Sequence, residues 1–137
     1  MSLNTSSVIR RHMKRSSNFV LCDDTARLPV VVPLESGEGL VGWIRNPQPW
    51  EETVVVFTSL AMYVTEGGHV TRIGLREVID YDTPKDKADA TGVQVRTAYG
   101  DFFIRMAGRY GPESKYGDVF NLLMILQTLV THNKAAE

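Results

Sequence analysis

The chain has 137 residues, of which 43% are hydrophobic and 23% charged, and 15 Lys+Arg against 16 Asp+Glu leave a net charge of −1. These values are typical of one soluble globular domain, and the length leaves no room for a second full domain. A single cysteine excludes an internal disulfide framework, and with three scattered histidines it gives no metal-ligand spacing, so we expect no metal and no cofactor.

The first 20 residues carry four basic groups and no acidic ones: Arg10, Arg11, Lys14 and Arg15. Such an arm can contact an anionic surface, but it is too short and too poor in aromatic residues to bind nucleic acid by itself, so no nucleic acid is expected. Its two serine pairs and low apolar content favour a solvated, partly disordered terminus. We therefore assign residues 1–35 to a basic arm and an extended lead-in.

From residue 39 onward, the sequence predicts short strands separated by turns. Val-rich or alternating runs define seven of them: Leu40–Arg45, Thr53–Thr58, Ala61–Glu66, His69–Leu75, Val78–Tyr81, Gly92–Thr97 and Asp101–Met106. Gly67-Gly68 and Tyr99-Gly100 mark hairpin turns between neighbouring strands. Residues 85–91 are polar and highly charged, which predicts an exposed loop.

One amphipathic helix is predicted over Tyr116–Val130, because apolar residues recur there at helical spacing. The predicted buried positions are Val119, Leu122, Leu123, Leu126, Leu129 and Val130. The fold class is therefore mainly β with a C-terminal α-helix, followed by a tail over residues 132–137.

Six or seven antiparallel strands followed by one helix resemble the pleckstrin-homology-like (PH-like) fold, a partial barrel capped by the helix. More narrowly, the runs Val54 to Val64, Thr71 to Val78 and Tyr99 to Ile104 are similar to bacterial PH-like and GRAM-like domains. The resemblance implies a PH-like partial barrel over residues 36–131. These motifs specify packing and not chemistry, so they leave the function open.

The same resemblance suggests testing the first hairpin, residues 43–52, as a phosphoinositide site. This hairpin offers one cation, Arg45, beside Glu51 and Glu52, which is too little converging positive charge for a multiply charged headgroup. Trp50 follows a proline in the turn and is expected at the surface, where it can anchor an interface, whereas Trp43 is expected in the core.

Exposed arginines on strands usually pair with neighbouring acids, so a free basic face on the sheet is not expected. The arginines in question are Arg72, Arg76, Arg96, Arg105 and Arg109.

No catalytic residues are predicted, and we expect no enzyme activity. Cys22, Ser59 and His69 lack the adjacent partners that would activate a nucleophile. Asp80 and Asp82 fit a turn as well as they fit a pair of catalytic carboxylates.

The sequence therefore predicts a non-enzymatic PH-like interaction module that binds a protein or peptide through a sheet edge or a groove beside the helix. The alternative is peripheral association with an anionic membrane through the basic arm and Trp50. A symmetric homodimer is a further expectation, because Val54–Phe57 and Gly92–Thr97 would be poorly guarded if they lay at an edge. The single cysteine, and the lack of an apolar run of ~20 residues, favour a cytoplasmic location.

Overall fold

The computed structural model describes residues 4–16, 18–46, 51–82, 92–106 and 117–135. Within them lie two α-helices, α1 (Thr5–Met13) and α2 (Gly117–Ala135), and two short 3-10 helices, η1 (Thr25–Arg27) and η2 (Leu75–Glu77). The strands are β1 (Phe19–Leu21), β2 (Leu40–Arg45), β3 (Thr53–Thr58), β4 (Ala61–Glu66), β5 (His69–Gly74), β6 (Val78–Asp82), β7 (Gly92–Thr97) and β8 (Gly100–Arg105).

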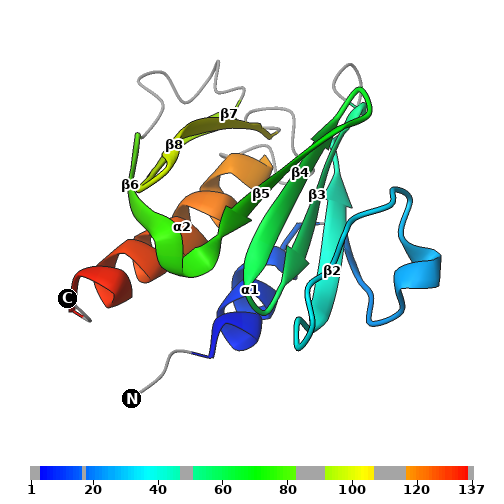
Figure 1. Cartoon of the computed structure of the whole chain (residues 1–137), viewed down its shortest axis with the longest axis horizontal. Helices are drawn as coiled ribbons and strands as arrows, with labels where there is room; N and C mark the ends of the chain where they lie inside the picture. The colour runs from blue at the N-terminus through cyan, green and yellow to red at the C-terminus, as the bar shows by residue number, and fades with distance from the viewer. Residues whose placement is uncertain (1–3, 17, 47–50, 83–91, 107–116, 136–137) are drawn as a thin grey trace.

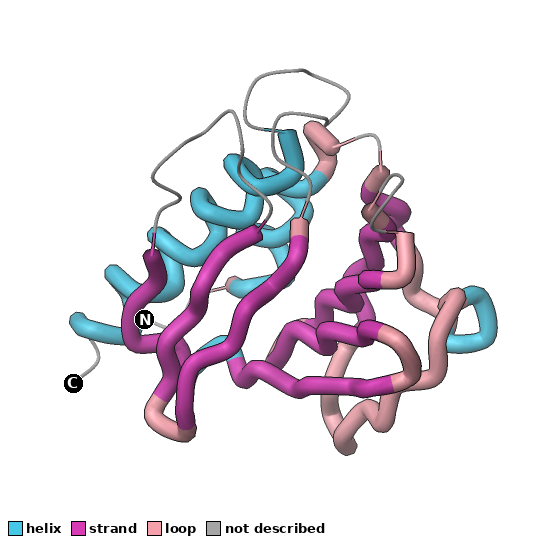
Figure 2. The backbone as a smooth tube through the Cα atoms, turned by 90° about the horizontal axis from the view of Figure 1, so that it is seen from above, coloured by secondary structure: helices cyan, strands magenta, loops and turns pink. Residues whose placement is uncertain are grey.

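These strands form two antiparallel sheets. One has five strands in the order β1-β2-β3-β4-β5, and the other has three in the order β6-β7-β8. Figure 2 shows the sheets as two separate walls, and the chain passes from one to the other through η2. The mainly β fold with a C-terminal helix is confirmed, and the described strands do not close into a barrel.

All seven predicted strands are confirmed, and their ends move by at most one residue. The turn between β4 and β5 illustrates why local signals suffice. Gly67 and Gly68 have φ values of 57° and 88°, in the left-handed region that glycine adopts without steric cost. Each strand therefore follows from its own apolar run or alternation and from the turn residues beside it.

The eighth strand, β1, was not predicted, and it depends on a close backbone approach at Gly42. β1 pairs with β2, placing Val20 opposite Trp43. A Cβ on Gly42 would lie 2.6 Å from Cζ of Phe19 and would also strike the carbonyl oxygen of Val20. Phe19 instead packs over this position and meets Phe57 edge-on, with ring centroids 6.0 Å apart.

The N-terminal helix α1 corrects our expectation of a partly disordered arm. Asn4 caps it, because its side-chain oxygen accepts a hydrogen bond from the Ser7 N–H at 3.0 Å. Val8, Ile9 and Met13 are buried in the main core, and α1 packs against α2. The short helix is held by this tertiary packing, since an isolated helix of its length is marginal in water.

The C-terminal helix α2 is confirmed, and it continues through residues 132–135, which we expected to form a tail. Leu122, Ile125 and Leu126 have no exposed area, whereas Leu123 is only partly buried against the core. The buried face is therefore turned slightly from the predicted one. It is wide because α2 packs on both α1 and β6.

A second apolar cluster lies on the opposite face of the five-stranded sheet from the main core. Its buried members are Val54, Val56, Ala61 and Tyr63. Residues 28–38, here called the covering segment, pack on it through alternate side chains: Leu28, Val30, Val32 and Leu34. Figure 1 shows the helices on one side of this sheet and the chain around η1 on the other. Both faces of β3 are thus covered. The part of the lead-in that forms the covering segment packs against the sheet.

Trp43 belongs to this second cluster, whereas Val41 lies in the main core. Regular strand alternation would place both side chains on one face. The pairing of β2 with β3 shifts between Leu40 and Gly42, however, and such a bulge reverses the alternation. Trp43 is therefore half-buried against the covering segment rather than in the main core.

The sheet edges differ from those considered for a homodimer. Val54–Phe57 belongs to β3 and Gly92–Thr97 is β7, and both are interior strands with a partner on each side. The prediction that either run offers an unguarded edge is wrong. The edge strands of the two sheets are β1, β5, β6 and β8.

Candidate functional site

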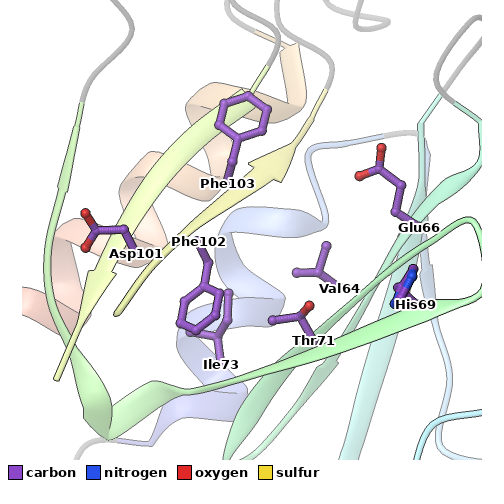
Figure 3. Close-up of a pocket in the computed structure, with 8 residues that line it drawn as sticks. All are labelled: Val64, Glu66, His69, Thr71, Ile73, Asp101, Phe102 and Phe103. Carbon is purple, nitrogen blue, oxygen red and sulfur yellow. The ribbon is translucent and has the colours of Figure 1, made fainter. Parts of the chain in front are cut away.

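A cleft of about 450 Å³ opens between the two sheets, and its lining comes from β4, β5 and β8. The lining residues are Val64, Glu66, His69, Thr71, Ile73, Asp101, Phe102 and Phe103. In Figure 3, the side chains of Thr71, Ile73 and Phe102 point into a common space, with Glu66 and His69 at one end. The volume lies in the range of pockets that hold small molecules or peptide side chains.

The cleft continues the main core outward along β4 and β5. β4 and β5 are neighbours in one sheet, and their cleft-lining side chains lie on the same face of it. Val64 and Glu66 alternate along β4, and His69, Thr71 and Ile73 alternate along β5. Exposure rises along β5 from the buried Ile73 through the half-buried Thr71 to the exposed His69. The deep end is therefore apolar, and the end near the Gly67-Gly68 turn is polar.

An ion pair spans the polar end of the cleft. Nε of Arg105, on β8, lies 3.6 Å from Oε1 of Glu66, on β4. The carbonyl oxygen of Arg105 accepts a hydrogen bond from Nδ2 of Asn46 at 2.9 Å, which ties the end of β8 to the residue after β2. Phe103 adds a half-exposed ring at the rim.

Two of the nucleophile candidates weighed in the sequence, Ser59 and Cys22, each make a hydrogen bond with a backbone group. The Ser59 hydroxyl accepts from the Gly39 N–H at 2.9 Å, and the buried Cys22 donates to the Asp24 carbonyl at 3.1 Å. His69, the third residue weighed as a candidate in the sequence, lines the cleft, whereas Cys22 and Ser59 do not. In the part of the chain that the structure describes, no three His, Cys, Asp or Glu side chains could jointly hold a metal ion.

The basic residues and the tryptophan considered in the sequence analysis lie elsewhere. Arg10, Arg11, Lys14 and Arg15 are exposed along α1 and the turn after it, and Arg45 is exposed at the end of β2. None of the five forms a salt bridge with another described residue. Trp50 lies outside the described residues.

A polar network fastens the covering segment to the outer face of the sheet. The enclosed carboxylate of Glu38 accepts hydrogen bonds from the Thr58 hydroxyl and, at 2.6 Å, from the Tyr63 hydroxyl. Arg72 donates from Nε to the Tyr63 oxygen at 3.1 Å and lies 3.7 Å from Glu38. These contacts join the covering segment to β3, β4 and β5.

Glu38 is ionised in this network. Burial raises its pKa, since a charge is poorly solvated there. Hydrogen bonds from Thr58 and Tyr63 and the charge of Arg72 outweigh burial, so the pKa lies below its ordinary value of 4.5. The carboxylate of Glu38 is therefore charged at neutral pH.

The prediction that strand arginines pair with acids is confirmed for three of them. Arg96 on β7 donates from one nitrogen to both carboxylate oxygens of Asp82, at 2.9 and 3.1 Å. Arg72 and Arg105 have the glutamate partners given above. Arg109 lies outside the described residues.

Sequence reasoning missed the cleft, because its walls come from strands that are distant along the chain. The nearest local signal was the pair Glu66 and His69 flanking a Gly-Gly turn, where an inward-facing position becomes polar.

No described helix is long and apolar enough to cross a membrane. No family model, curated protein or solved structure matches this chain.

Proposed function

We propose that this chain is a non-enzymatic, cytoplasmic PH-like interaction module whose cleft binds an extended segment of a partner protein. The order of the elements supports the PH-like part of this proposal: four strands β2–β5, the η2 corner, three strands β6–β8 and a terminal helix. The single cysteine, which is free and buried, supports a reducing compartment.

One observation carries the binding proposal: β5 is an edge strand, and its inward side chains line the cleft. An edge strand directs part of its backbone N–H and C=O groups away from the sheet, where an extended peptide can pair with them. Alternate side chains of such a peptide would then enter the cleft. Backbone pairing supplies affinity, and the cleft supplies selectivity.

The test uses peptides selected against the intact protein from a phage-displayed library of random linear peptides. Each selected peptide is labelled, and its affinity is measured by fluorescence anisotropy. Replacing Thr71 with arginine fills the cleft from within, so Thr71→Arg should weaken binding by at least about tenfold. Val70→Arg is the matched control, because Val70 is the adjacent β5 residue, is exposed and does not line the cleft.

Two outcomes would contradict the proposal. Equal weakening by Thr71→Arg and Val70→Arg would mean that the cleft is not the binding site. A concentration-dependent dimer in light scattering that Thr71→Arg converts to a monomer would mean that a second copy of this chain occupies the edge. Chemical denaturation of both variants checks that each remains folded.

The second candidate function, association with an anionic membrane, is favoured by the four exposed cations of α1 and its following turn. None of these four cations forms a salt bridge with another described residue, and burial together with the charges of Arg11 and Arg15 lowers the pKa of His12. Each cation near an anionic bilayer is worth about 1 kcal/mol. The apolar side of α1 is buried in the core, so only its cations are available for this contact.

Vesicle co-sedimentation tests this second candidate. Vesicles of mixed phosphatidylserine and phosphatidylcholine should bind the protein in a salt-sensitive manner, and phosphatidylcholine alone should not. Arg10→Gln with Arg11→Gln should reduce binding. The control replaces two exposed arginines elsewhere, Arg27→Gln with Arg76→Gln, and an equal reduction there would exclude a site on α1.

A further inference from the structure

The ion pair between Arg105 and Glu66 lies across the polar end of the cleft but is weakly held. Its atoms are 3.6 Å apart, beyond hydrogen-bond distance, and the side chains are 35% and 49% exposed. Pairs of this kind contribute little, because water screens them and two long side chains must be ordered. The guanidinium of Arg105 can therefore leave Glu66 at small cost.

Displacing that side chain would not disturb the wall of the cleft. The backbone of Arg105 is held separately by the Asn46 hydrogen bond to its carbonyl oxygen. β8 is also paired along its length with β7. Only the side chain of Arg105 has to move.

The charge around the cleft favours a cationic ligand. The lining contains two acids, Glu66 and Asp101, and neither lysine nor arginine among the described residues. Asp101 is directed away from Glu66 in Figure 3, so Glu66 is the acid at the polar end.

We propose that the cleft selects a peptide segment carrying an arginine, whose guanidinium replaces that of Arg105 on Glu66. The inference rests on the proposed function and names the chemistry of its ligand. A planar guanidinium can form two parallel hydrogen bonds with a carboxylate, which the long contact from Arg105 does not. An apolar side chain of the same peptide packs on Ile73 and Phe102 at the deep end.

The register of β5 sets the spacing of these two groups. His69, opposite Glu66, and Ile73 are four positions apart on the same side of β5. In an extended peptide paired with β5, side chains four residues apart lie on one face and are separated by about 13 Å. Selected peptides should therefore carry an arginine and a large apolar residue at that spacing.

The first test replaces the peptide arginine with citrulline, which keeps the shape and removes the charge. Binding to the unmodified protein should weaken about tenfold, and binding to Glu66→Gln should change much less, because the partner charge is already absent. If citrulline weakens binding equally in both proteins, the arginine does not contact Glu66 and the inference is wrong.

The second test removes the internal competitor. Arg105→Gln should tighten binding of the arginine peptide about threefold, because Glu66 is then free. Arg96→Gln is the control, since Arg96 is a strand arginine in the same sheet whose partner, Asp82, does not line the cleft, whereas the partner of Arg105, Glu66, does. Weaker binding to Arg105→Gln would overturn the inference.

The two proposals fail in different ways. If Thr71→Arg blocks the selected peptides but citrulline binds as well as arginine, the peptide-binding function stands and the arginine preference is wrong. If Thr71→Arg leaves binding unchanged, both proposals fail.

Discussion

At the scale of single residues, Glu38 holds a charge with 0% of its side chain exposed, so its hydrogen bonds decide whether that charge stabilises the fold. Glu38→Gln should lower the free energy of unfolding by about 1–3 kcal/mol, because hydrogen bonds to a charge are lost in an enclosed site. Urea denaturation at neutral pH measures this loss. Glu35→Gln is the control, since Glu35 is exposed and makes one 3.5 Å ion pair with Arg72. It should cost less than about 1 kcal/mol.

The same carboxylate predicts a dependence of stability on pH. The folded pKa of Glu38 lies below its ordinary value of 4.5, so the unfolded chain binds this proton more readily. The stabilisation is complete above that value and is lost as the pH falls through the folded pKa. The difference in unfolding free energy between the unmodified protein and Glu38→Gln should stay constant at neutral pH and shrink below 4.5. A difference that grows in acid would contradict this assignment.

At the scale of elements, α2 offers a comparison of two leucines on one helix. Leu122 has no exposed area, whereas Leu123 is only partly buried. Leu122→Ala should lower the free energy of unfolding by about 2–5 kcal/mol, because it leaves a cavity in the core. Leu123→Ala removes the same atoms from a less enclosed site and should cost clearly less. Chemical denaturation measures both losses. If Leu123→Ala lowers the free energy of unfolding as much as Leu122→Ala does, Leu123 is a core position, as the sequence predicted.

The strands could be predicted because each carries its own apolar run or alternation and its own turn residues, as β4 and β5 do around Gly67-Gly68. α1 could not, because its three buried side chains are set among serines and arginines and gain their partners from α2. The face of Trp43 depends on a bulge that local alternation does not reveal. The cleft was missed for the same reason as α1, since it exists only where distant strands meet.

At the scale of the whole molecule, α1 should contribute to global stability. Ile9 is 1% exposed in the main core, so Ile9→Ala should lower the free energy of unfolding by about 2–5 kcal/mol. Arg10→Ala, at the next and exposed position, should change it by no more than about 0.5 kcal/mol. Equal, negligible effects in thermal or chemical denaturation would show that α1 is detached in solution.

The contact between α1 and α2 also governs when the fold can be completed. α1 lies at the beginning of the described chain and α2 at its end, and all the described strands lie between them. Contacts between distant parts of a chain form slowly, because the entropy of closing the loop is lost before the contact is gained. During synthesis, the hairpins of β3, β4 and β5 can pair soon after they leave the ribosome. The part of the apolar side of α1 that contacts α2 stays uncovered until α2 has been made, so the nascent chain exposes those residues longer than it exposes any hairpin.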